Sequence, residues 1–146
     1  MQTVEEIRDL ADSRLEEARL LYDNGYYDGA AYIVGYAVEL ILKAKVCELL
    51  EVPDFFHENS SVDGKVLRSF KTHDLEALLI LSGLRNKFQL AKRNNIDLAD
   101  NWIIICEWSE NRRYLPKGTF SAQNTLEFLN AISDNQNGFK TWIENI

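Results

Sequence analysis

The stretch YYDGAAYIVGYAVELILKAKVCELL, Tyr26–Leu50, decides the fold of this chain. Between Ala30 and Leu42 its apolar residues fall on nearly all sides of a helix. That pattern is typical of a helix surrounded by other helices. The glycines at 29 and 35 lower the helix propensity, so they indicate places where a neighbour comes close to the backbone. We expect this helix to end before Pro53, since proline disfavours helical geometry in the residue ahead of it.

Helices are expected on both sides of this central one. Thr3 followed by Glu6 has the spacing of a capping box, and apolar residues then recur at helical spacing as far as Asn24. Residues 53–72 form one long, turn-rich connection, and its Thr72 is the expected N-cap of the next helix. The remaining helices are expected over 73–81, 84–94 and 96–114, and from Ser121 onwards with a continuation to Trp142.

The chain has no clear run of alternating apolar and polar residues, so no strand is predicted. Its 146 residues suit one compact domain. We therefore predict an all-α protein, an up-and-down bundle of four or five helices that forms a single domain over residues 1–146.

The net charge of −7 argues against broad nucleic-acid binding through charge alone. Residues 65–117, however, carry ten Lys or Arg against six Asp or Glu, which permits a local anion site. No stretch is long and apolar enough to span a membrane, and the first residues do not have the pattern of a signal peptide. Cys47 and Cys106 lie in apolar stretches, as reduced core cysteines do, so a cytoplasmic location is expected.

Hydrogen-bonding side chains gather in WSENRRYLPKG, residues 108–118. Arg112 and Arg113 there have two interpretations. They cap the negative end of a helix, or they form a fork for a phosphate beside Tyr114, on whose ring a base stacks.

Two further positions carry candidate site residues. Glu39 and Lys43 stand four apart in the apolar central helix, either as an ordinary ion pair or with Glu39 holding one of the guanidinium groups. His73 follows Thr72, either as a surface or capping residue or as a proton-transfer group near Arg113. With two histidines and no metal-ligand spacing, neither a metal nor a cofactor is expected.

The chain contains three blocks in a characteristic order: residues 13–44, KTHDLEALL at 71–79 and NRRYLP at 111–116. In this order they resemble the HEPN family (higher eukaryotes and prokaryotes nucleotide-binding) in its small prokaryotic form. The resemblance extends over essentially the whole chain. It implies a helical bundle, usually a homodimer, often paired with a minimal nucleotidyltransferase. Many family members are ribonucleases that act as toxins or in antiviral defence, with an arginine followed four to six residues later by a histidine.

The chain departs from that motif, because no histidine follows Arg112 and Arg113. Arg68 and His73 have the literal spacing but straddle a loop and a helix start. Arginine binds phosphate without supplying a base, and tyrosine with a pKa of ~10 is a poor base at neutral pH. Phosphate recognition is therefore better supported than catalysis.

Three functions remain open at this point. The first is a homodimeric module that binds a nucleotide, an RNA phosphate or a nucleotidyltransferase partner without catalysis. The second is a divergent metal-independent ribonuclease that uses Arg113 with His73 or Tyr114. The third is a structural interaction protein.

Overall fold

The computed structural model describes residues 3–146, and within them it contains eight α-helices, one 3-10 helix and no strand. The all-α class is thus confirmed. Five helices have ten or more residues, and three short ones raise the number above the four or five expected. Their bounds are α1 Val4–Asp23, α2 Tyr27–Leu49, α3 Gly64–Phe70, α4 Leu75–Leu81, α5 Arg85–Asn94, α6 Ile96–Cys106, η1 Glu110–Tyr114, α7 Ala122–Ser133 and α8 Phe139–Glu144.

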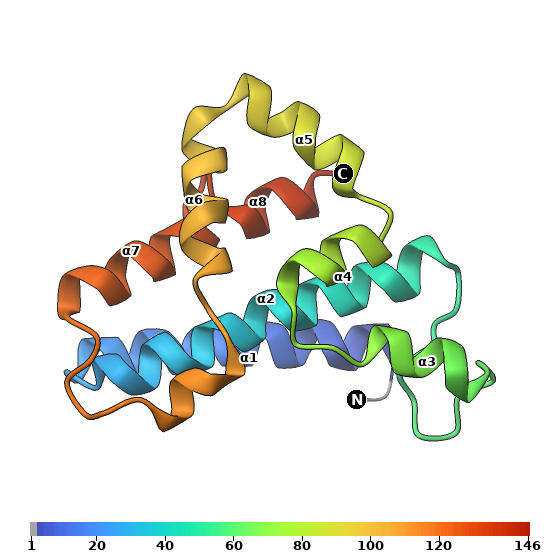
Figure 1. Ribbon diagram of the computed structural model, residues 1–146, viewed down its shortest axis with the longest axis horizontal. Coiled ribbons are helices and arrows are strands. Elements are labelled where there is room, and N and C mark those ends of the chain that lie inside the picture. Colours follow the sequence, from blue (N-terminus) through green and yellow to red (C-terminus); the bar gives the residue numbers. More distant parts are fainter. Residues whose placement is uncertain (1–2) are drawn as a thin grey trace.

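Helices α1 and α2 lie side by side and run in opposite directions (Figure 1). The predicted capping box is present, since the Thr3 hydroxyl accepts from the backbone of Glu6 and the Glu6 carboxylate accepts from that of Thr3. Gly25 separates the two helices with a φ of 83°, a conformation that glycine adopts without strain. Local sequence signals therefore set this hairpin.

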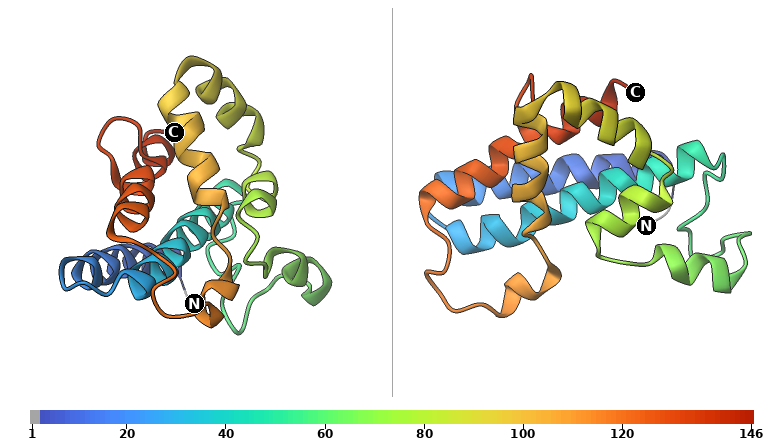
Figure 2. Two further views of the ribbon diagram at one scale, coloured as in Figure 1. Left: turned by 60° about the vertical axis from the view of Figure 1, so that its left-hand side comes forward. Right: turned by 45° about the horizontal axis from the view of Figure 1, so that its top comes forward.

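Helix α2 is the central element, as its sequence predicts. It contacts α1, α4, α7 and η1, and thirteen of its residues are buried. Helices α5 and α6 stand over it, while α7 and α8 cross beside them (Figures 1 and 2). The larger core cluster joins α2 residues such as Val34, Val38 and Leu42 to side chains of α4 to α8.

Three expected boundaries were wrong. Residues 53–72 are not free of regular structure, because Asp63 caps the short helix α3. Asp74, rather than Thr72, is the N-cap of α4, and Thr72 accepts a hydrogen bond from the backbone of Asp74 instead. The last helix breaks after Ser133, where the Asp134 carboxylate accepts from two backbone N–H groups and ends α7.

The arginine segment also differs from its expected form. Residues 96–114 are not one helix, because α6 ends at Cys106 and the arginines lie in the separate 3-10 helix η1. Ser109 caps η1 by accepting from the Asn111 N–H. The segment therefore leaves the axis of α6 and lies against α2.

In the part of the chain that the structure describes, no helix is long and apolar enough to cross a membrane.

Candidate functional site

One side of α2 supplies four polar side chains, those of Tyr32, Tyr36, Glu39 and Lys43. Steps of four, three and four residues keep them in one stripe along the helix. Helix α4 and η1 both contact α2, and they bring the segment with His73 and the segment with Arg113 to this stripe. Residues from three separate parts of the chain thus meet on one element.

Glu39 is the centre of a buried charge group. Its carboxylate accepts a hydrogen bond from the His73 ring at Nδ1, and the Lys43 ammonium lies 3.6 Å from the same oxygen. The side chains of Glu39 and Lys43 are each 5% exposed, whereas that of His73 is 49% exposed. Burial lowers the pKa of Lys43, and the charge of Glu39 opposes that shift. With Nδ1 engaged, Nε2 is the ring nitrogen of His73 left for another partner.

The tyrosine pair, Tyr32 and Tyr36, connects this group to η1. Their hydroxyl oxygens are 3.2 Å apart, and the Tyr36 ring meets the His73 ring edge-on at 6.0 Å between centroids. Burial raises the pKa of Tyr36, so its hydroxyl stays protonated at neutral pH.

Trp108 holds the tyrosine pair in place. Its indole N–H donates to the backbone oxygen of Tyr32 at 2.9 Å, and its ring meets that of Tyr36 at 4.9 Å. A Cβ atom on Gly35 would overlap the indole ring. The neighbour expected to come close to the backbone at Gly35 is therefore the Trp108 side chain. Because Trp108 lies between α6 and η1, this contact positions η1 against α2.

Arg113 and Tyr114 lie on the surface next to the tyrosine pair. The guanidinium carbon of Arg113 is 4.8 Å from the centroid of the Tyr114 ring, and Tyr114 is 73% exposed. The Tyr32 hydroxyl is the main cause of a raised pKa at Arg113. Within residues 3–146 no carboxylate forms an ion pair with Arg113. Its charge is therefore available to an anion.

The Arg112 side chain points inward, unlike that of Arg113. Its guanidinium lies between the rings of Phe120 and Phe128, at 4.7 and 4.6 Å, and donates to the Ala31 backbone oxygen at 3.0 Å. Burial lowers its pKa to about 10. The structure thus places Arg112 in the packing between η1, α2 and α7, and it does not pair the two arginines as one fork.

A hollow of about 370 Å³ lies beside His73, and we call it the acidic hollow because Asp74, Glu76 and Glu110 line it. Glu76 accepts from the Trp102 indole N–H at 2.8 Å and from the Cys106 thiol at 3.4 Å. Burial raises the pKa of Cys106 to about 12, so this thiol is not a nucleophile at neutral pH. Three carboxylates here disfavour a polyanion on this side of His73.

Sequence reasoning missed two parts of this arrangement. The sequence around the tyrosines of α2 gives no local signal of a site, and only the later segments that reach them show that they connect His73 to η1. Asp28 was not singled out, yet its carboxylate accepts from the backbone N–H groups of Gly118 and Phe120 at 2.7 and 2.9 Å. It thereby holds the loop after η1 on the first turn of α2. Among residues 3–146, no three His, Cys, Asp or Glu side chains are grouped so as to hold a metal ion.

The comparison with known protein families agrees with this architecture over its central hairpin. Residues 4–62, which span α1, α2 and the segment after them, match the model of the HEPN domain. This stretch of the chain is therefore similar to the HEPN domain. The matched residues include the tyrosine pair, Glu39 and Lys43 of the α2 stripe. His73 and η1 lie after the end of the match. No curated protein and no solved structure matches this chain.

Proposed function

We propose that this protein, whose residues 4–62 are similar to the HEPN domain, binds a phosphate of a nucleotide or of RNA at Arg113, beside Tyr114 and the tyrosine pair. The observation that carries the proposal is the exposed guanidinium of Arg113, which forms no ion pair among residues 3–146 and lies next to the tyrosine pair, whose Tyr36 ring contacts the His73 ring. A guanidinium presents donors in a planar fork that suits phosphate oxygens.

The surroundings of Arg113 also fit the rest of such a ligand. Tyr114 offers an exposed aromatic face, and stacking on a ring of this kind accepts any base. The Tyr32 hydroxyl adds a polar group next to the guanidinium. The acidic hollow lies on the His73 side, so the phosphate belongs at the Arg113 end of the stripe.

Thermal unfolding in the presence of nucleoside monophosphates and short RNA oligomers tests this binding. A ligand that binds only the folded state raises the unfolding temperature. We expect Arg113→Ala to weaken the affinity about tenfold, since a charge-assisted bidentate contact is lost. Arg93→Ala, an exposed arginine on α5, is the matched control and should bind like the parent protein. Equal stabilisation of the Arg113 and Arg93 variants would contradict the proposal.

A metal-independent ribonuclease is the second candidate, favoured by the hydrogen bond between His73 and the buried Glu39. A carboxylate that orients an imidazole is a common arrangement for a general base. In that reaction His73 takes the proton of the RNA 2′-hydroxyl, whose oxygen forms a bond to the neighbouring phosphorus, while Arg113 stabilises the charge that develops on the phosphoryl oxygens. The bond from phosphorus to the 5′-oxygen breaks, and that leaving oxygen takes a proton from solvent.

The ribonuclease candidate is separated from simple binding by two variants assayed with EDTA present. Cleavage that is lost in His73→Ala while RNA binding remains indicates catalysis. Cleavage that persists in both His73→Ala and Arg113→Ala comes from a contaminating enzyme.

The family resemblance adds two expectations about partners, a homodimer and a minimal nucleotidyltransferase in a toxin–antitoxin or defence setting. Sedimentation equilibrium measures the first. Co-expression with the neighbouring open reading frame measures the second, and the Arg113 and Tyr114 variants tell whether the partner covers the same face. If neither RNA, nucleotide nor partner protects this face, the arginine segment is structural.

A further inference from the structure

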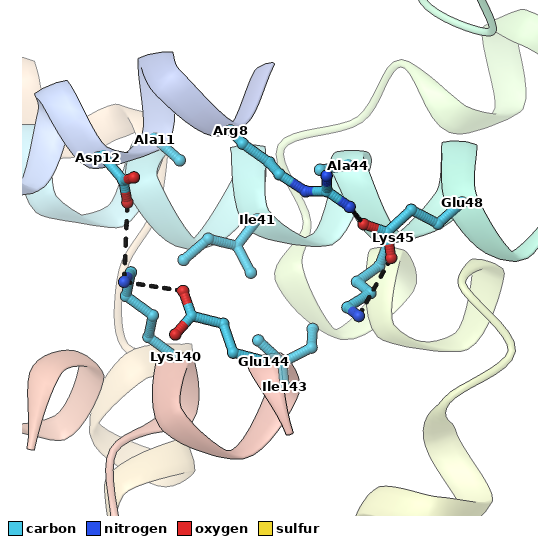
Figure 3. Close-up of a pocket in the computed structure, with 10 residues that line it drawn as sticks. All are labelled: Arg8, Ala11, Asp12, Ile41, Ala44, Lys45, Glu48, Lys140, Ile143 and Glu144. Carbon is cyan, nitrogen blue, oxygen red and sulfur yellow. Dashed lines mark ion pairs between the residues drawn. The ribbon is translucent and has the colours of Figure 1, made fainter. Parts of the chain in front are cut away.

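A second hollow, of about 240 Å³, lies between α1, α2 and α8 and contains none of the residues discussed above (Figure 3). Its apolar part is made by Ala11, Ile41, Ala44 and Ile143. This volume is below the ~300 Å³ at which sites for drug-sized ligands begin, so its occupant is small. We call it the α1–α2–α8 pocket.

One end of the pocket has an excess of positive charge. Arg8 and Lys45 both pair with a single carboxylate, that of Glu48, and the Lys45 ammonium is 3.1 Å from it. Lys45 is only 16% exposed, so water solvates its charge poorly. Among the ion pairs of residues 3–146, two cations thus share one anion at this end, which leaves an excess of one positive charge there.

The other end has the opposite excess. The Lys140 ammonium lies 2.8 Å from Glu144 and 3.7 Å from Asp12, so two carboxylates share one cation. Figure 3 shows this group and the Arg8 group at opposite ends of the pocket, with Ile41 between them. The hollow is therefore neutral as a whole and polarised along its length.

The pKa values of the two lysines agree with this polarity. Burial, and after it the charge of Arg8, lowers the pKa of Lys45, while Glu144 acts in the opposite sense. Hydrogen bonding to Glu144 is the main cause of a raised pKa at Lys140, and Asp12 adds to it. Lys45 thus gains from a further anion, whereas Lys140 is already well compensated.

From these observations we infer that the α1–α2–α8 pocket binds a small zwitterion with an anionic group and an ammonium group separated by an aliphatic body. The anionic group lies at Arg8 and Lys45, the ammonium lies at Asp12 and Glu144, and the aliphatic body covers Ile41. This site is independent of the face at Arg113.

Straight-chain ω-amino acids, from aminobutanoate to aminooctanoate, are suitable probes. They are titrated at constant ionic strength into the protein while the methyl resonances of Ile41 and Ile143 are followed by NMR. We expect one chain length to give saturable shifts with a Kd on the order of 1 mM, because partly exposed ion pairs are weak. The alkanoate and the alkylamine of that length should each bind about three- to tenfold more weakly, since each makes one of the two charge contacts.

Variants test the two ends separately. Lys45→Met should weaken the ω-amino acid about three- to tenfold without affecting the alkylamine, and Asp12→Asn should do so without affecting the alkanoate. Lys87→Met and Asp9→Asn, on exposed parts of α5 and α1, are the matched controls and should leave binding unchanged.

Three results would overturn the inference. They are the absence of saturable shifts at Ile41 and Ile143 with every probe, equal binding of the singly charged probes, and parent-like binding in both pocket variants. Should a variant fail to fold, the comparison of probes on the parent protein decides alone.

Discussion

The Glu39 carboxylate compensates a lysine that lies inside the helical bundle. Removing one partner of a buried pair leaves the other charge without compensation, which is strongly destabilising. We expect Glu39→Gln to lower the free energy of unfolding by about 3 kcal/mol, as measured by urea denaturation. The glutamine amide oxygen can still accept from the His73 ring, so this variant removes the charge next to His73 but keeps an acceptor for Nδ1.

The double variant Glu39→Gln with Lys43→Met is the control for that interpretation. It removes the unpaired ammonium and keeps a side chain of similar length, so much of the lost stability should return. A double variant that is less stable than Glu39→Gln alone would show that Lys43 has another stabilising role, such as its contact with the Phe56 ring at 5.6 Å.

At Gly35 the packing of Trp108 against α2 depends on the absence of a Cβ atom. A methyl group there meets the Trp108 ring, which is 4% exposed and has little freedom to move. Gly35→Ala should therefore lower the free energy of unfolding by about 1–3 kcal/mol despite the higher helix propensity of alanine.

Gly64 offers a matched control for this substitution. It begins α3, and a Cβ atom on it meets no other atom within 4 Å. Gly64→Ala should leave stability unchanged or raise it slightly, because alanine restricts the unfolded chain. Equal effects of the two substitutions in urea denaturation would contradict the role given to Trp108.

At the scale of elements, Asp28 ties the loop after η1 to α2, and this contact gives the protein a pH dependence. Backbone N–H groups of Gly118 and Phe120 lower the pKa of the Asp28 carboxyl from its usual 3.8. Its contribution to stability is therefore complete above the unfolded pKa and is lost as the pH falls through the lower folded pKa.

We expect Asp28→Asn to unfold more easily than the parent protein at neutral pH, by about 1 kcal/mol, since the carboxylate is partly exposed. The difference should disappear in acid, below both pKa values. Urea denaturation at several pH values measures it. Asp9→Asn serves as the control, because Asp9 lies exposed on α1, and it should show no such pH-dependent difference.

The elements also show what the sequence can and cannot predict. Contacts between near neighbours were predictable, such as the Thr3–Glu6 box and the Glu39–Lys43 pair, because spacing alone places them. The contact of Glu39 with His73 joins residues 34 positions apart, and no local pattern encodes it. Arg112 likewise turns inward because Phe120 and Phe128 reach it from the following loop and α7. At the start of α4, Thr72 and Asp74 are both suitable caps, and spacing could not choose between them.

At the scale of the whole molecule, the residues that match the HEPN domain do not contain all of the hydrophobic core. The matched residues contain nearly all of the smaller core cluster, in which Ile7, Leu40 and Phe55 pack together. They contain only the α1 and α2 part of the larger cluster, whose other members belong to α4 and later elements. A fragment of residues 1–62 would therefore expose Val34 and Val38, which are 0% exposed when α4 to α8 are present.

We expect that fragment to be helical by circular dichroism, to bind a hydrophobic dye and to unfold without a sharp transition. These are the properties of a compact chain without fixed packing. Mixing it with residues 63–146 should restore a sharp transition, because the two pieces rebuild the larger cluster and bury its apolar surface again. A fragment that unfolds sharply by itself would make residues 4–62 an independent domain, and the single domain expected over 1–146 would then be wrong. Sharp unfolding only in the mixture would instead mean that the HEPN hairpin depends on α4 to α8 for one of its two buried faces.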